Sequence, residues 1–125
     1  MDTASPRTRD IGVWNVVRVD YPFADEARIR RRPALVIAVP AVRQDFAVLW
    51  VMMITSAQTG RWPLDVPISN LALGGLDHSC VVRTSKITAM DARLAVPIGE
   101  LSEADRVGVR TSLRVALKDA LRACP

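Results

Sequence analysis

The chain of 125 residues is half hydrophobic and 24% charged, with a formal net charge of +4. This length predicts one domain, since domains span about 100–200 residues, and the apolar fraction excludes a disordered chain. No apolar stretch reaches the roughly 18 residues of a membrane-spanning helix, and Cys80 and Cys124 form neither a zinc motif nor a disulfide framework. Because residues 1–10 are polar and do not resemble a secretory signal, we expect a cytoplasmic protein with a flexible tail over 1–10 and a single domain over 11–125.

The first half of the chain predicts three strands. Val13–Tyr21 carries β-branched and aromatic side chains with a period of two and ends before a proline. Ala34–Val39 is a short apolar run between two prolines, and proline is tolerated at the first position of a strand. Phe46–Ile54 is a longer run rich in Val, Phe and Trp. It predicts a central strand covered on both faces, with Trp50 in the core.

The second half begins with shorter elements. Four segments are strand candidates: Asp65–Ile68, Cys80–Thr84, Ile87–Met90 and Ala95–Ile98. Lys86–Ala89 is alternatively a bend, and residues 70–79, which contain two consecutive glycines, predict a loop.

The final segment predicts an amphipathic helix over Glu103–Ala123. Ser102, followed three residues later by Asp105, resembles a capping box at its start. Apolar residues then recur at helical spacing: Val109, Leu113, Ala116, Leu117, Ala120 and Leu121. A basic stripe runs beside them: Arg106, Arg110, Arg114, Lys118 and Arg122. Strands followed by one terminal helix predict a mainly β (α+β) fold, a small antiparallel sheet or barrel with a helix on it.

Common catalytic motifs are absent from the sequence. It contains no P-loop, no dinucleotide fingerprint and no zinc-protease motif. The single histidine excludes a two-histidine nuclease. His78 is a candidate lone general base, although a histidine in such a polar loop is more commonly just exposed. A nucleophile pair of Cys80 and His78 is weaker, because it requires both side chains on one face of one strand.

Arginine dominates the basic residues, with fifteen Arg against Lys86 and Lys118. Guanidinium groups suit bidentate phosphate contacts, but a GC-rich genome explains the same excess, so the charge permits a nucleic-acid partner without requiring one. Four arginines are predicted in the loop before Pro33: Arg28, Arg30, Arg31 and Arg32. Such runs are usually solvated. Arg32 differs because Pro33 holds it extended where a buried strand begins, which suits electrostatic stabilisation of a phosphate.

Two further features carry hydroxyl groups and cations. Thr55 and Ser56 end the long apolar run, where hydroxyls orient a phosphate or, more commonly, cap a turn. Gln58 can read a base edge, and Arg83 lies at the margin of a short strand with Lys86 nearby. Together with Arg32 they predict a phosphodiester site at one edge of the barrel that needs no metal.

Five motifs then occur in a recognisable order. V-D-Y-P-F leads through the basic loop into R-R-P-A-L-V-I, and the long apolar strand ends I-T-S. D-V-P-I and V-V-R-x-x-K-I-x-x-M-D follow, and L-S-E-A-D opens the last helix. In this order the motifs resemble the PemK/MazF-type toxins of type II toxin–antitoxin pairs, from about Val13 to Leu121. The resemblance implies a small SH3-like barrel with a C-terminal helix, usually a homodimer, and a cognate antitoxin protein as partner.

The resemblance also implies an activity and its residues. Such toxins are bacterial endoribonucleases that need no metal or cofactor and cut single-stranded RNA. The 2′-hydroxyl attacks the adjacent phosphate and leaves a 2′,3′-cyclic phosphate and a 5′-hydroxyl end. By motif, Arg32, Thr55 and Arg83 correspond to residues of the catalytic site. We expect RNA contacts from their neighbours: Arg30, Arg31, Ser56, Gln58, Ser85 and Lys86.

Three residues in two segments depart from the family pattern. Trp14-Asn15 stands where many members carry Gly-Asp, and Ser85 stands where many carry an aspartate that can act as a base. A neutral serine does not act as a base without help. Other groups considered for that role are Asp25, Glu26 and His78. The loss of the acid favours two alternatives: a non-catalytic protein that acts by binding, like the CcdB-like gyrase poisons, or a degenerate module that only binds an antitoxin.

Overall fold

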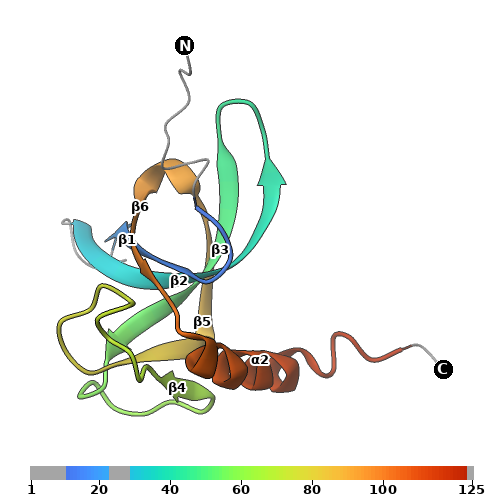
Figure 1. Cartoon of the computed structure of the whole chain (residues 1–125). Helices are drawn as coiled ribbons and strands as arrows, with labels where there is room; N and C mark the ends of the chain where they lie inside the picture. Colours follow the sequence, from blue (N-terminus) through green and yellow to red (C-terminus); the bar gives the residue numbers. More distant parts are fainter. Residues whose placement is uncertain (1–10, 23–28, 124–125) are drawn as a thin grey trace.

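Within the residues that the structure describes, six strands form one antiparallel sheet and one helix follows the last strand (Figure 1). The computed structural model describes residues 11–22 and 29–123. The strands are β1 (Asn15–Pro22), β2 (Ile29–Val42), β3 (Ala47–Ser56), β4 (Asp65–Pro67), β5 (Cys80–Asp91) and β6 (Ala95–Glu100). A single 3-10 turn, η1 (Ala92–Leu94), precedes β6, and the helix is α2 (Glu103–Leu117).

The mainly β fold with a C-terminal helix is confirmed. The strand order β4-β5-β3-β2-β1-β6 places β4 and β6 at the two edges, so the sheet is not closed into a barrel. The sheet is nevertheless strongly curved (Figure 1). The predicted tail over residues 1–10 lies outside the described residues. Asp25, Glu26 and Arg28 also lie outside them. No described helix is long and apolar enough to cross a membrane.

β3 is the central strand that its apolar run predicts. It pairs with β2 on one side and β5 on the other. Leu49, Val51 and Met53 pack into one buried cluster, while Met52 and Ile54 pack into a second cluster with Leu101 and Val109. Burial on both faces therefore follows from alternation of side chains along one strand.

Trp50 corrects the prediction that it lies in the core. Its side chain is 48% exposed, and it borders an apolar hollow of about 370 Å³ together with Ile87 and Leu117. Trp50 shares its face of β3 with Met52 and Ile54, but lies where only the last turns of α2 flank that face. The hydrophobic run predicts a strand correctly but does not tell how far the helix covers it.

β2 is longer than predicted at both ends. Arg31 and Arg32, placed in a loop by the sequence pattern, lie within the strand opposite Asp20 and Val19 of β1. Pro40 does not end the strand, because β2 continues to Val42. Register shifts beyond Val36 mark an irregular stretch of the β2–β3 ladder, which is where a proline without its N–H group is tolerated.

β5 is one strand where the sequence predicts two. Its register against β3 jumps from Arg83 opposite Met53 to Ile87 opposite Met52. The intervening residues, Thr84 to Lys86, form a bulge. The sequence pattern correctly indicates an irregularity at this point. The bulge changes the direction of side chains within β5, but it does not end the strand.

α2 begins where predicted and ends earlier. The Ser102 side chain accepts a hydrogen bond from the Asp105 N–H, as a helix cap does. The Asp105 carboxylate accepts 2.8 Å bonds from the Ser69 N–H and Oγ, which ties the helix to the segment after β4. The helix ends at Leu117 and not at Ala123, since Leu121 beyond it is 73% exposed and has no sheet to pack on.

The loop of residues 70–79 is held tightly against β6. The Glu100 N–H donates a 3.0 Å bond to the Leu73 carbonyl. A Cβ atom at Gly99 would overlap this same carbonyl, and one at Gly75, whose φ is +69°, would overlap the Ile98 carbonyl. The two glycines therefore allow the close approach that places the end of this loop, residues Asp77 and His78.

Candidate functional site

Two adjoining hollows lie beside the ends of β2, β3 and β5. The first, of about 190 Å³, contains Thr59, Arg83 and Lys86 and is called the Arg83 hollow. The second, of about 240 Å³, contains Arg31, Ser56, His78 and Cys80 and is called the His78 hollow. Arg32, Ile54 and Thr55 line both of them. Arg32 and Thr55 are therefore at the boundary between the hollows.

Thr55 belongs to a short chain of hydroxyl groups at the end of β3. Its Oγ1 is 3.3 Å from the Thr59 Oγ1, and the Thr59 hydroxyl donates a 2.6 Å bond to the Ser56 carbonyl. A hydroxyl has one proton, so Thr59 accepts from Thr55 and Thr55 is the donor of that pair. The remaining capacity of the Thr55 oxygen is to accept a hydrogen bond.

Ser56 and Gln58 shape the turn that follows. The Ser56 Oγ accepts a 3.3 Å bond from the Gln58 N–H, so this hydroxyl caps the turn, the more common of its two predicted roles. Ser56 also lines the His78 hollow. Gln58 is exposed and lines neither hollow.

Arg83 is buried and held by the segment that precedes β4. Its side chain donates to both carboxylate oxygens of Asp65, at 3.2 and 3.0 Å, and to the Gly60 carbonyl at 2.7 Å. The guanidinium carbon lies 4.4 Å from the centre of the Trp62 ring. Burial raises the pKa of Asp65, but the hydrogen bonds from Arg83 and from the Trp62 N–H outweigh it and hold this pKa below its ordinary value. Asp65 therefore stays ionised and neutralises Arg83.

Ser85 occupies the position where an acid was expected by resemblance. Its hydroxyl donates a 3.0 Å bond to the Pro63 carbonyl, and it lines neither hollow. Ser85 thus helps Arg83 to hold residues 60–65 in place. Lys86, one residue on, lines the Arg83 hollow.

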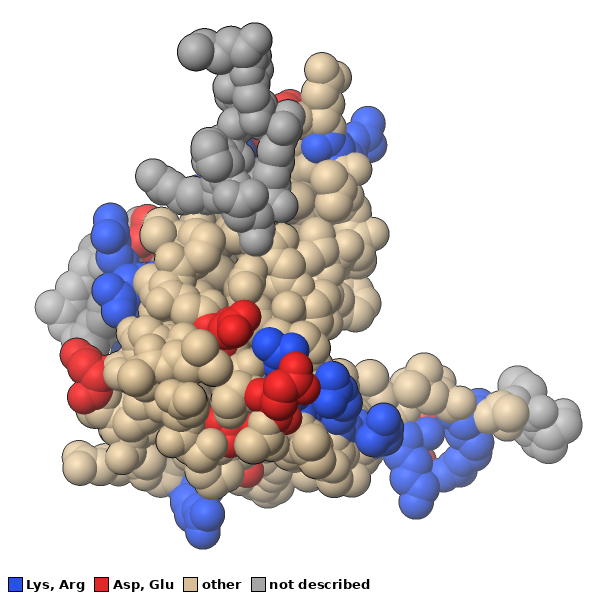
Figure 2. All heavy atoms as spheres, viewed as in Figure 1, with Lys and Arg blue, Asp and Glu red and all other residues tan. Residues whose placement is uncertain are grey.

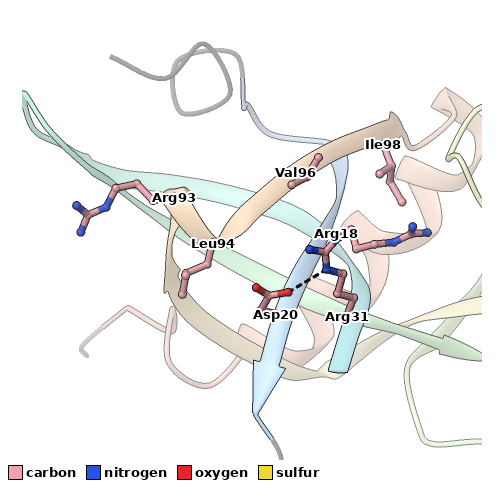
Figure 3. Close-up of a pocket in the computed structure, with 7 residues that line it drawn as sticks. All are labelled: Arg18, Asp20, Arg31, Arg93, Leu94, Val96 and Ile98. Atoms are coloured by element: carbon pink, nitrogen blue, oxygen red, sulfur yellow. Dashed lines mark ion pairs between the residues drawn. The ribbon is translucent and has the colours of Figure 1, made fainter. Parts of the chain in front are cut away.

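Arg31 faces a third hollow, of about 250 Å³, between β1, β2 and β6 (Figure 3). Its Nε is 3.4 Å from Asp20, toward which it points, whereas the guanidinium group of Arg93 points away from this pair. Because Arg31 also lines the His78 hollow, the two hollows adjoin at this side chain. The Arg30 side chain lies outside the described part of the chain.

The structure thus brings together most of the residues singled out by sequence. Arg32, Thr55, Arg83 and Lys86 line one hollow, while Arg31 and Ser56 line its neighbour. Gln58 and Ser85 are outside both. Sequence reasoning did not list Thr59 at the site, although its spacing of four residues from Thr55 across a turn was a usable signal. Among the described residues no group of His, Cys, Asp or Glu could hold a metal ion.

Comparison with known proteins supports one family. A family model, described as PemK-like, MazF-like toxin of type II toxin–antitoxin system, matches residues 13–117. No curated protein shows significant similarity to the chain.

Solved structures resemble the chain in fold. The Mycobacterium tuberculosis toxin MazF-mt6 superposes with a TM-score of 0.63 at 19% identity, covering 83% of this chain and 96% of that one. MazE–MazF from Deinococcus radiodurans gives 0.62 at 21% identity, covering 85% and 94%. An endoribonuclease in complex with its cognate antitoxin from a mycobacterial species gives 0.64 at 18% identity, covering 90% and 97%.

Proposed function

Because the chain belongs to the PemK-like, MazF-like toxins of type II toxin–antitoxin systems, we propose that it is a sequence-selective endoribonuclease that cleaves single-stranded mRNA without a metal ion. The observation that carries this proposal is the meeting of Arg32 and Thr55 at the boundary of the two hollows. This chemistry requires a cation and an oriented hydroxyl group beside a bound phosphate.

The proposed reaction uses the RNA's own 2′-hydroxyl as nucleophile. The 2′-oxygen forms a bond to phosphorus, the bond from phosphorus to the 5′-oxygen breaks, and the proton leaving the 2′-oxygen is balanced by one gained at the 5′-oxygen. Negative charge builds on the phosphate oxygens in the transition state, and a pre-positioned cation stabilises it. Dependence on the 2′-hydroxyl makes the reaction specific for RNA.

The proposed roles follow from where each side chain is held. Arg32 extends from a paired position in β2 and supplies the charge beside the phosphate. Thr55, which donates to Thr59, has an oxygen left to accept a hydrogen bond from the bound RNA. Lys86 attracts the phosphate backbone in the Arg83 hollow. Arg83, neutralised by Asp65, acts mainly by positioning residues 60–65.

The first prediction tests this activity with purified protein and a long single-stranded RNA in EDTA. We expect discrete cuts with 5′-hydroxyl ends, and a loss of about 10²–10³-fold in rate for Arg32→Ala, the range for removing one transition-state donor. Arg43→Ala is the matched control, because Arg43 is exposed in the turn between β2 and β3. RNA that stays intact across sequences and pH would contradict a nuclease.

A binding-only protein is the second candidate function. Two observations favour it: Asp65 neutralises Arg83, and Ser85 supplies no acid. The same incubation separates the two candidates, because a gyrase poison or an antitoxin-binding module leaves RNA intact.

We further propose a homodimer and an antitoxin as partners. The relatives' names support this, since one is a MazE–MazF structure and another an endoribonuclease with its cognate antitoxin. The exposed apolar surface formed by Trp50, Ile87 and Leu117 is also suited to burial against a protein partner.

A further inference from the structure

His78 lies in the wall of a hollow that the proposed reaction uses. The loop of residues 70–79 brings it to the same hollow as Arg32, Thr55 and Ser56, which come from β2 and β3. The sequence pattern alone made an exposed loop histidine the more common interpretation. The side chain is indeed 58% exposed, and the fold also places its imidazole beside the residues proposed to hold the phosphate.

Asp77 orients this imidazole. The His78 Nδ1 is 2.7 Å from the Asp77 Oδ1. The hydrogen bond from His78 and then the charge of His78 lower the pKa of Asp77, so this carboxylate is ionised at neutral pH. A carboxylate at this distance accepts a hydrogen bond from Nδ1–H of the neutral ring, which leaves Nε2 as the free acceptor.

The remaining groups around the two hollows do not supply a base. None of the described residues that line them is acidic. Arg31 and Arg32 face His78 from β2, and Arg18 of β1 acts on Asp77 through its charge. Burial raises the pKa of the Cys80 thiol on β5, so that group stays protonated. His78 is then the one lining residue, among those described, whose side-chain type commonly serves as a general base.

We propose that His78 is the general base of the RNA cleavage reaction and that Asp77 positions it. Nε2 takes the proton of the 2′-hydroxyl as the 2′-oxygen bonds to phosphorus, and the departing 5′-oxygen takes a proton from water. The imidazolium then returns its proton to solvent, so the exchange balances. This inference rests on the proposed nuclease function.

The second prediction compares wild type with His78→Gln and Asp77→Asn on a short RNA that contains a mapped cut site. For His78→Gln we expect kcat to fall about 10²–10⁴-fold, the range for a lost general base, with KM little changed. For Asp77→Asn we expect a smaller fall. Ser79→Ala is the matched control, because Ser79 is in the same loop and lines neither hollow.

The pH profile separates a base from a structural residue. A general base acts only when it is deprotonated, so wild-type kcat should rise with pH and then level off. His78→Gln should lose this levelling, and added imidazole should restore part of the activity of His78→Ala. Binding of a fully 2′-O-methylated RNA should stay unchanged, which checks that the variants fold.

The outcomes distinguish the two proposals. If wild type cuts RNA and His78→Gln keeps its rate or its pH profile, the role of His78 is overturned while the nuclease stands. A lower rate that imidazole does not restore also overturns it. If wild type leaves all RNA intact, the nuclease proposal itself fails.

Discussion

Arg32 and Arg83 occupy different electrostatic settings although both are arginines at strand margins. Arg83 is 6% exposed and its charge is neutralised by the ionised Asp65. Arg32 is half-buried and lines both hollows. Arg32 lines both of the open hollows in which a bound phosphate would lie, whereas Arg83 is buried against Asp65, so Arg32 should dominate transition-state stabilisation.

Trp14 shows how the chain tolerates a departure from the family pattern. Its φ of +77° lies in the left-handed region that favours glycine, which many members carry here. Arg106 and Arg110 lie over its ring at 5.6 and 5.1 Å, and this packing offsets the backbone strain. Asn15 accepts a 2.7 Å bond from the Gly12 N–H, as an aspartate would.

The third prediction concerns Thr84 in the bulge of β5. Its Oγ1 is buried and has no hydrogen-bond partner among the described residues. Valine has the same shape without the hydroxyl, so Thr84→Val should raise the free energy of unfolding by about 1 kcal/mol, or the melting temperature by about 4 °C. Thermal unfolding measures this change. Thr111→Val on the exposed helix surface is the control, and a lower melting temperature for Thr84→Val would show that the hydroxyl is paired.

At the scale of elements, the sequence pattern predicted those features that depend only on residues close together in the chain. The run from Phe46 to Ile54 specified a central strand, and Ser102 specified the helix start, because each depends on neighbours in sequence. The end of α2 and the exposure of Trp50 depend on how far the sheet and helix overlap, which no local pattern contains. The same holds for the site: motif order singled out Arg32, Thr55 and Arg83, but only the packing of the 70–79 loop on β6 brings His78 to Arg32 and Thr55.

The fourth prediction concerns the ion pair that joins β4 to β5. Asp65 is 5% exposed and paired with Arg83, so Asp65→Asn leaves a buried guanidinium unpaired. We expect a loss of about 3–5 kcal/mol in the free energy of unfolding at pH 7. Asp119→Asn is the control, because Asp119 pairs with Arg122 at the surface and such pairs are worth about 0–1 kcal/mol.

The difference in the free energy of unfolding between wild type and Asp65→Asn should depend on pH, because the pKa of Asp65 is lowered in the folded protein. A carboxylate whose pKa is lower in the folded state stabilises the fold above its unfolded pKa, and this contribution is lost as the pH falls through the folded value. Urea unfolding should therefore show a wide gap between wild type and Asp65→Asn at pH 7 that narrows below the ordinary value of 3.8. A gap that is constant with pH would mean that the pair does not cause it.

At the scale of the whole molecule, basic side chains gather along α2 and the chain after it (Figure 2). Part of the basic stripe is already engaged within the protein. Arg106 donates 2.8 Å to the Leu101 carbonyl, Arg110 lies over Trp14, and Arg122 pairs with Asp119. Arg114 and Lys118, both exposed, are then the members best suited to meet an acidic segment of an antitoxin.

The last prediction tests this surface with the double reversal of Arg114 and Lys118 to Glu. Arg110 is the obvious choice from sequence, but reversing it would also remove its contact with the Trp14 ring. A loss of stability could then be mistaken for a loss of antitoxin binding. We expect at least about a tenfold loss of affinity for the cognate antitoxin in calorimetry, and a weaker salt dependence, because exposed charge pairs are screened by salt. Reversal of Arg43 and Arg93 is the matched control, because both side chains are exposed. Arg43 belongs to the turn between β2 and β3 and Arg93 to η1, and both of these segments lie at the end of the molecule opposite α2 (Figure 1). Equal affinity for the two double variants would make the stripe an ordinary solvated helix face.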